Sequence, residues 1–403
     1  MPSDAVAAAR APPAPAGLRL LNVIPSVDPA RGGTVEGLRH SIAATAALGH
    51  RDEVATLDAV GDACVQAFPA LVHALGPTRT RYGYSAALLP WLRAHAAEYD
   101  AVIVHGVWQY HSLAVWRALR GTGVPYFVYF HGMLDPWFKR RYPLKHLKKW
   151  LYWPWADYRV ARDARAVLFT AREEARRAAQ SFWLYRVTPA VVGYGLAADA
   201  PLSPGQCDAF HAAHPGLRGK RLLLFLARLH PKKGGDLLIA AFAELARRDP
   251  QAHLVLAGPD EGGHAAALKA QAQALGVADR VTFTGLLQGD LKWGALQAAE
   301  VFVLPSHQEN FGVAVVEALA CALPVLISEQ VNIWREIVDD GAGLAAADSL
   351  AGTRDLLSRW WALAPEARSD MREAALRCYR THFRMSAAAA RLIDTIRPHL
   401  RAA

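Results

Sequence analysis

One stretch, residues 304–328, restricts the possible fold more than any other part of this sequence. The apolar run at 301–304 predicts a buried strand, and a polar loop follows it. The Ala-rich run 313–323 predicts a helix, Pro324 ends that helix, and 325–327 begins another strand. Two neighbouring parallel strands need such a crossover between them. The stretch therefore predicts an α/β fold with a parallel sheet.

Two carboxylates, Glu309 and Glu317, flank the junction between this loop and this helix. In open α/β sheets, ligands bind at the carboxyl ends of strands, where helix N-termini point at them. Glu309 is expected at that mouth, and Glu317 about one to two turns further along the helix, at ~1.5 Å of rise per residue. Such a pair suits contact with two parts of one long ligand better than a close acid dyad. A solvated loop carboxylate and a helix-surface glutamate are the alternative for these two residues.

The Glu-x7-Glu spacing, with the letters ENFG at 309–312 and the Ala-rich helix, resembles the signature of the retaining GT-B glycosyltransferases of family 4, group 1, of the bacterial polysaccharide type. The resemblance implies that Glu309 approaches the donor sugar and pyrophosphate, and that Glu317 binds the nucleotide ribose. The donor site would include four residues at the start of the helix: Asn310, Phe311, Gly312 and Val313. Asn310 and Ala322 stand where glycine is usual in the family, and we expect Asn310 to influence the choice of donor.

A second site feature follows the strong apolar strand predicted at 221–227. Arg228 and Lys233 lie five residues apart before a helix predicted at 236–247, so both can reach one anion. Arginine offers a planar fork to phosphate oxygens and lysine a mobile point charge, which suits a pyrophosphate at a helix N-terminus. A basic loop without a ligand is the alternative. The resemblance implies that both side chains hold the diphosphate, while Lys232 is expected to face solvent.

Two further residues of the predicted donor site follow strands in the second half of the chain. Gly258 follows the strand predicted at 253–257, and Leu286 follows the strand predicted at 281–285. In the resembled family, the nucleobase lies where Leu286 stands.

The first half begins with a strand at 18–24, a loop that ends in Gly32 and Gly33, and a helix at 34–48. Paired glycines between a strand and a helix let backbone N–H groups approach a ligand, although a plain turn is the alternative. The resemblance implies that this loop faces the donor phosphates and the acceptor across the cleft. No element is assigned at 58–97.

A histidine, His131, directly follows the strand predicted at 126–130. The carboxyl end of a parallel strand is where α/β folds place functional groups, and a structural histidine is the alternative. In the resembled family, a histidine at this place contacts the transferred sugar.

The segment 137–159 is basic and rich in tryptophan. Six Lys or Arg and no acidic residue occur from Lys139 to Lys149. Four tryptophans flank this run: Trp137, Trp150, Trp153 and Trp155. Basic segments with tryptophan dock on anionic membranes, with ~1 kcal/mol from each cation near the headgroups. We expect peripheral membrane contact through 137–155, and a solvated basic helix with packed aromatics is the alternative.

Composition limits the class of protein. The chain has 403 residues, 53% hydrophobic and 20% charged, which is typical of a folded two-domain protein. Its formal net charge of +9 favours anionic partners such as sugar nucleotides, but no nucleic-acid motif accompanies it, so no nucleic-acid partner is predicted. Four cysteines without CxxC spacing, and no apolar run of about 18 residues, predict a cytoplasmic protein, peripheral at the inner membrane face if the basic segment docks.

The predicted organisation is two Rossmann-like domains facing across a deep cleft. A flexible tail at 1–17 precedes an acceptor-side domain at 18–200 and a donor-binding domain at 201–385. A polar segment at 196–219 is expected to be the linker, with a short helix. The resemblance implies that the last helix, within 386–403, crosses back onto the first domain.

The function that follows is transfer of a hexose from a UDP- or GDP-sugar to a glycan or a polyprenyl-diphosphate-linked saccharide in polysaccharide biosynthesis, with retention implied by the resemblance. Catalysis must stabilise the departing diphosphate, which calls for fixed positive charge. No Asp-x-Asp stands at a strand end, so basic side chains are expected to replace a metal, and no cofactor is predicted. A sugar-nucleotide epimerase of the same fold and a non-catalytic, membrane-associated partner of a polysaccharide assembly complex remain alternatives.

Overall fold

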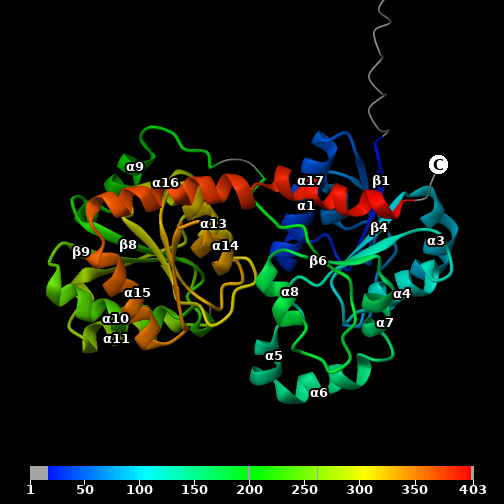
Figure 1. The fold of residues 1–403 in the computed structure, drawn as a ribbon, viewed down its shortest axis with the longest axis horizontal. Helices are drawn as coiled ribbons and strands as arrows, with labels where there is room; N and C mark the ends of the chain where they lie inside the picture. The colour runs from blue at the N-terminus through cyan, green and yellow to red at the C-terminus, as the bar shows by residue number, and fades with distance from the viewer. Residues whose placement is uncertain (1–16, 198–199, 261, 401–403) are drawn as a thin grey trace, which may run out of the picture.

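The computed structural model describes residues 17–197, 200–260 and 262–400, and shows two α/β domains side by side (Figure 1). Nearly all of the predicted tail at 1–17, and the last three residues, lie outside the described residues. Each domain is built on one sheet whose strands are all parallel, which confirms the predicted fold class.

The first domain contains a seven-stranded sheet in the order β3-β2-β1-β4-β5-β6-β7. Its strands are β1 (Arg19–Ile24), β2 (Arg51–Thr56), β3 (Leu71–Ala74), β4 (Ala101–His105), β5 (Tyr126–Tyr129), β6 (Ala166–Phe169) and β7 (Pro189–Val191). The central strands are apolar and buried on both faces, as a parallel sheet covered by helices requires.

Eight α-helices connect these strands. They are α1 (Gly33–Ala47), α2 (Ala63–Gln66), α3 (Leu88–His95), α4 (Tyr110–Leu119), α5 (Pro136–Arg141), α6 (Pro143–Tyr152), α7 (Asp157–Asp163) and α8 (Arg172–Ala178). The unassigned residues 58–97 contain α2, β3 and α3. Strand β3 lies at the sheet edge and none of its residues is buried, so its sequence carries little hydrophobic signal.

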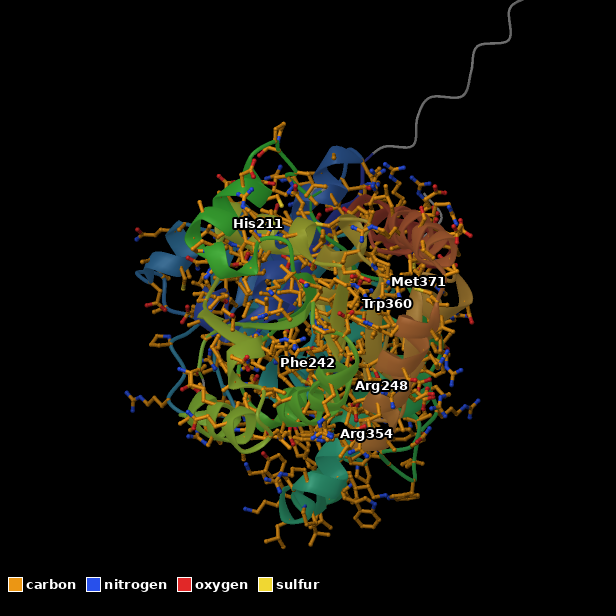
Figure 2. All side chains as sticks on the ribbon, turned by 90° about the vertical axis from the view of Figure 1, so that its left-hand side faces the viewer. His211, Phe242, Arg248, Arg354, Trp360 and Met371 are labelled. Atoms are coloured by element: carbon orange, nitrogen blue, oxygen red, sulfur yellow. The ribbon has the colours of Figure 1, made fainter. Side chains whose placement is uncertain are left out.

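The second domain contains a six-stranded sheet in the order β10-β9-β8-β11-β12-β13. Its strands are β8 (Arg221–Leu226), β9 (Ala252–Ala257), β10 (Val281–Gly285), β11 (Val301–Leu304), β12 (Val325–Ser328) and β13 (Gly343–Ala346). Its helices are α9 (Gln206–Ala213), α10 (Gly235–Arg248), α11 (His264–Ala274), α12 (Gly289–Ala298), α13 (Val313–Ala320), α14 (Trp334–Asp339), α15 (Leu350–Ala362) and α16 (Pro365–His382). Figure 2 views this domain end-on, with the buried Phe242 of α10 and Trp360 of α15 labelled.

The short helix expected within the predicted linker at 196–219 is α9, which packs against α12 with Phe210 fully buried in the second core. One local expectation was wrong. The helix predicted at 313–323 ends at Ala320, and Ala322 follows with a φ of 53°. Left-handed backbone at Ala322 explains why glycine would be the easier residue at that position.

The C-terminal helices join the two domains. Helix α16 runs along the second domain and α17 (Met385–Ile396) continues over the first, where it packs against α1 (Figure 1). Arg391 donates a hydrogen bond to the Val192 carbonyl at 2.9 Å, and Ile396 is fully buried in the core beside β1. Among the described residues, no helix is both long and apolar enough to cross a membrane.

Candidate active site

Residues of both domains line one cavity of about 230 Å³. They are Gly33, Thr34, His131, Thr170, Tyr194, Glu309, Asn310, Phe311, Gly312 and Val313. The first-domain residues follow β1, β5, β6 and β7, and the others lie between the end of β11 and the first residue of α13. The cavity therefore lies at the carboxyl ends of both sheets, where parallel α/β folds bind ligands.

An ion pair between Lys233 and Glu309 is the central polar contact of this site. Lys233 follows β8 and Glu309 follows β11, which are neighbours in the sheet. The loop holding Glu309 is tied to the turn holding Lys233, because the Ser306 hydroxyl donates to the Lys232 carbonyl at 3.0 Å and the His307 N–H donates to it at 2.8 Å. The side chain of Lys233 is only 10% exposed, so its charge is held in place beside the cavity.

The start of α13 supplies backbone donors at the same place. Gly312 is its N-cap, with a φ of 80°, and the first two helical residues are Val313 and Ala314. The N–H groups of these three residues donate to none of the described residues. Unpaired N–H groups and the helix dipole make this end suited to an anion.

His131 reaches the cavity from the first domain in a backbone conformation with a φ of 50°. Its ring stacks on Tyr129, with centroids 5.1 Å apart, and its Nε2 atom lies 3.2 Å from Nδ1 of His105. Burial lowers the pKa of His131 to about 4, so the ring is neutral at physiological pH.

The two first-domain glycines differ in role. Gly32 has φ 85° and ψ −150°, a conformation that side chains rarely adopt, whereas Gly33 lines the cavity. A Cβ atom would meet nothing within 4 Å at either position, so the space beside both backbones is open.

Arg228 and Lys232 lie at the mouth of the second domain. Arg228 is exposed and does not line the cavity that Lys233 borders. Lys232 does not face open solvent as expected, because it is half-buried with Nζ 5.4 Å from the ring centre of Trp137 in the first domain. Burial lowers the pKa of Lys232, and the charges of Lys233 and Arg228 lower it further.

Besides Gly32, three predicted donor residues lie outside this cavity. Glu317 pairs with Lys292 of α12 at 2.6 Å, a partner that sequence reasoning missed because no motif links the two helices. Leu286 is 58% exposed after β10, where it can offer a flat apolar surface. Gly258 is a packing requirement, because a Cβ atom there would lie 1.9 Å from the Ala227 carbonyl oxygen.

Asn310 and Phe311 also contact parts of the chain outside the donor domain. Asn310 accepts a hydrogen bond from Asn332 of its own domain at 3.2 Å, and it lies so close to Gly132 of the first domain that a Cβ atom on this glycine would be 2.6 Å from the Asn310 Oδ1 atom. Phe311 is buried and packs edge-to-face on Tyr194, with centroids 4.7 Å apart. These two residues therefore help to set the distance between the domains.

Helix α8 adds charged contacts across the cleft that sequence reasoning missed. Glu173 is paired with Arg335 of the second domain at 2.9 Å, and its side chain is 1% exposed. Arg177 donates to the Gln330 side chain and to the Glu329 carbonyl, both at 2.7 Å. The run REEARR at 172–177 carries the charges, but nothing in it indicates their partners.

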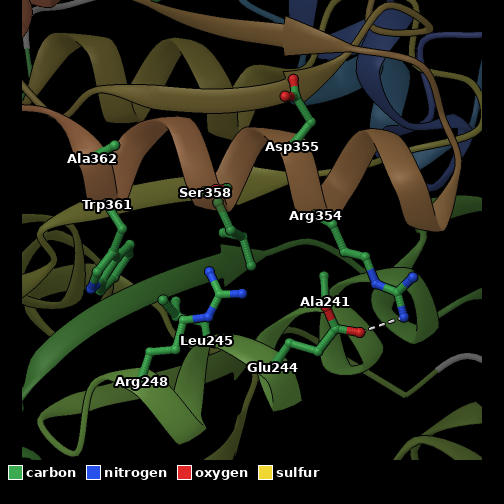
Figure 3. A pocket seen from close by; sticks show the side chains of 10 residues that line it. Ala241, Glu244, Leu245, Arg248, Arg354, Asp355, Ser358, Trp361 and Ala362 are labelled. Atoms are coloured by element: carbon green, nitrogen blue, oxygen red, sulfur yellow. Dashed lines mark ion pairs between the residues drawn. The ribbon is translucent and has the colours of Figure 1, made fainter.

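A larger cavity of about 470 Å³ lies elsewhere, between α10 and α15 of the second domain (Figure 3). Glu244 and Arg354 form an ion pair of 2.5 Å across it, and Arg248 and Trp361 lie beside them. It shares no residue with the cavity between the domains.

Among the described residues that line the cavity between the domains, the possible metal ligands are Glu309 and His131. Glu309, the carboxylate that lines it, is already paired with Lys233. Within the described parts of the chain, one group of possible metal ligands occurs after β2, namely Asp58, Asp62 and Cys64, and none of them lines the cavity.

Two parallel α/β domains with a cavity between their strand ends define the GT-B class of proteins. A solved structure of this shape is HepE from Anabaena in complex with UDP, with a TM-score of 0.74 and 19% identity over 94% of this chain and 100% of that one. The model described as glycosyl transferases group 1 matches residues 208–377, and that described as glycosyl transferase 4-like domain matches 32–195. The chain belongs to the group 1 glycosyltransferases of family 4.

Curated relatives match only parts of the chain. D-inositol 3-phosphate glycosyltransferase of Kineococcus radiotolerans is 34% identical over 178 residues, 41% of this chain and 40% of that protein. Alpha-D-kanosaminyltransferase of Streptomyces kanamyceticus is 31% identical over 195 residues, 46% of this chain and 48% of that protein. This chain therefore matches less than half of the length of both relatives.

Proposed function

We propose that this protein transfers a hexose from a nucleotide-diphosphate sugar to a glycan or a lipid-linked saccharide. The observation that carries the proposal is the Lys233–Glu309 pair, placed at the start of α13 and opposite His131. One cation, free backbone N–H groups, a carboxylate and a neutral imidazole are together what a diphosphate joined to a sugar requires.

The proposed mechanism follows from the charge that develops when the bond between sugar and diphosphate breaks. The leaving diphosphate gains negative charge, which Lys233, Arg228 and the N–H groups at Gly312 and Val313 stabilise. The sugar gains positive charge, and Glu309 orients its hydroxyls and offsets that charge. Because Glu309 is already paired with Lys233, donor phosphates that attract Lys233 leave this carboxylate available to the sugar.

Metal independence and retention of configuration are part of the proposal. Lys233 and the helix start supply the positive charge that a metal supplies in other glycosyltransferases, so chelators should leave activity intact. Retention rests on the resemblance to the retaining family. Glu317, held by Lys292, and the exposed Leu286 would bind the ribose and the base.

A polyprenyl-linked acceptor gains support from an exposed surface of the first domain. Helices α5 and α6 project from its lower edge (Figure 1), and the same segment extends below the second domain in Figure 2. We call this surface the basic aromatic face. Its residues are Leu144, Leu147, Trp150, Leu151, Trp155 and Trp183 with the cations Arg141, Lys145 and Lys148.

The exposure of this face is unusual for apolar side chains. Leu144 is 79% exposed, Trp155 is 72% exposed and Trp183 is 65% exposed. Of the other tryptophans in the segment, Trp153 is fully buried and Trp137 lies under Lys232. Apolar side chains beside exposed cations suit an anionic lipid surface, which would bring the enzyme to a membrane-bound acceptor.

A soluble acceptor is the second candidate. The name D-inositol 3-phosphate glycosyltransferase favours a polyol phosphate as the acceptor, whereas alpha-D-kanosaminyltransferase is named for the sugar that it transfers. Because these relatives match this chain over less than half of its length, we place the lipid-linked saccharide first.

The proposal is tested by incubating the protein with UDP- and GDP-hexoses in the presence of EDTA and measuring release of the nucleoside diphosphate. We expect release with one donor, and loss of that release in Glu309→Gln. No release with any donor, with or without acceptor extracts, would favour the non-catalytic partner. A change in the sugar configuration without nucleotide release would favour the epimerase.

A further inference from the structure

Four polar side chains form a hydrogen-bonded chain that ends at His131. It crosses four neighbouring strands or strand ends, since Asp52 lies on β2, Asn22 on β1, His105 on β4 and His131 after β5. Asn22 Nδ2 donates to Asp52 Oδ1 at 2.8 Å, and Asn22 Oδ1 lies 3.0 Å from His105 Nε2. His105 Nδ1 lies 3.2 Å from His131 Nε2. Asn22 and His105 are both buried, so no bulk water competes for these bonds.

The donors and acceptors of these four hydrogen-bonded side chains allow one arrangement of protons. Burial raises the pKa of Asp52 to about 6, and above that pH its oxygens only accept. Asn22 must therefore turn its NH₂ group to Asp52, which leaves its carbonyl oxygen facing His105. A carbonyl oxygen accepts only, so His105 carries its proton on Nε2 and presents a lone pair on Nδ1.

The same reasoning determines which nitrogen of His131 carries the proton. Burial lowers the pKa of His105 well below its usual range and that of His131 to about 4, so each neutral ring has one N–H. The lone pair of His105 Nδ1 needs a donor, which makes Nε2 the protonated nitrogen of His131. Nδ1 of His131 is then an acceptor, and it bonds to none of the described residues.

We infer that Asn22 and His105 are positioning residues that fix the tautomer of His131, so that His131 accepts a hydrogen bond through Nδ1 from a hydroxyl of the transferred sugar. This inference rests on the proposed function, because His131 lines the cavity that would hold that sugar. It gives the site a rule of specificity: the hydroxyl facing His131 must be free to donate. A sugar with hydrogen, fluorine or an ether at that carbon loses the bond.

The tautomer is measured directly on the ¹⁵N-labelled protein without ligand, by two-bond correlations between ring protons and ring nitrogens. His131→Gln assigns the signals. We expect a proton on Nε2 and none on Nδ1 of His131 in the wild type, and a mixture of tautomers in Asn22→Leu and His105→Phe. His95 is a partly exposed histidine of the same domain, and His95→Phe should leave the His131 signals unchanged. A proton on Nδ1 in the wild type overturns the inference.

The sugar contact is measured with donors in which one hydroxyl at a time is replaced by hydrogen. We expect one deoxy donor to lower kcat/KM of the wild type by about three- to tenfold, the usual effect of one neutral hydrogen bond, and to have a smaller effect in His105→Phe. If every deoxy donor changed kcat/KM equally in the wild type and in His105→Phe, the inference would be overturned. Because the tautomer is read without substrate, a protein with the expected tautomer but no transfer activity would contradict the proposed function and not the positioning chain.

Discussion

The ammonium group of Lys233 is paired with the carboxylate of Glu309, which lies 76 residues further along the chain. The two loops that carry these side chains are joined through the Lys232 carbonyl, so the pair exists before any ligand binds. A cation and a carboxylate are thus held at the place where a sugar-diphosphate bond would be broken, and little reorganisation is needed at the moment of reaction.

Removing this pair should impair chemistry more than binding. We expect Lys233→Met to lower kcat by about 10²–10³-fold, since it removes a preorganised charge beside the leaving group. The double variant Lys233→Met/Glu309→Gln should lose less kcat than the product of the two separate fold-losses in kcat, because the residues act as a unit. Steady-state kinetics of the four proteins measure this coupling. A loss of kcat in the double variant that equals the product of the two single losses would contradict this coupling.

The contact between Gly132 and Asn310 should control how the domains approach. A methyl group on Gly132 would lie 2.6 Å from Asn310 Oδ1, and its φ of 71° disfavours alanine as well. Gly132→Ala should lower kcat/KM by more than tenfold, and adding Asn310→Gly should restore part of it. Gly121→Ala is the matched control, because φ there is 79° and nothing lies within 4 Å.

Gly121→Ala should cost about 1 kcal/mol of folding free energy without affecting transfer, since only the backbone conformation is disfavoured. Chemical denaturation and kinetics on the same samples separate the two effects. Wild-type activity in Gly132→Ala would mean that catalysis does not need the approach of Gly132 to Asn310.

The buried Glu173 should make the contact between domains sensitive to acid. Burial alone would raise its pKa, but hydrogen bonds from Arg176, Arg335 and Arg177 outweigh burial and lower the pKa to about 2 from an ordinary 4.5. A lowered pKa stabilises the fold above 4.5, and this contribution is lost as pH falls towards 2.

Glu173→Gln should therefore destabilise the protein by about 1.5–3 kcal/mol at pH 7, the range for hydrogen bonds to a charged group. The difference in Tm between wild type and variant should stay constant above the ordinary pKa and shrink below it. Glu98→Gln, at an exposed glutamate, serves as the control. A difference that does not depend on pH would show that the charge of Glu173 is not what stabilises the contact.

The basic aromatic face should bind anionic lipid. We expect wild-type protein to sediment with vesicles of phosphatidylcholine and phosphatidylglycerol, and less at high salt, because screening weakens the contribution of the lysines. Leu144→Glu with Leu151→Glu should weaken binding by at least tenfold, since two exposed leucines no longer enter the lipid. Val60→Glu, at a residue that is 72% exposed, should bind as the wild type does. Equal binding by all three proteins would contradict a role for this face.

Local patterns made much of the fold predictable. The strand, loop and helix around Glu309 were predicted because apolar periodicity indicates them within a short window, although the helix ends at Ala320 and not at Pro324. The short strand β13 was not predicted, because its sequence GLAA lacks the β-branched residues that indicate a strand.

The site was predictable only where its parts lie at strand ends. Lys233 and Glu309 follow neighbouring strands, so a parallel sheet brings them together. Contacts between the domains, such as that of Glu173 with Arg335, depend on how two separate units meet. No periodic pattern of residues in the sequence indicates them. His105 is the last residue of β4, and its bond to His131 depends on the pairing of β4 with β5.

The most direct test of the central claim, that the site between the domains holds a nucleotide diphosphate, is calorimetric titration with UDP, GDP and ADP in EDTA. Wild type, Lys233→Met and Arg228→Ala are compared with Lys220→Met, which changes an exposed lysine before β8, at the opposite end of that strand. We expect one nucleotide to bind the wild type and Lys220→Met equally, and both site variants at least tenfold more weakly. Binding that is unchanged in both site variants, or absent in the wild type, would contradict the account.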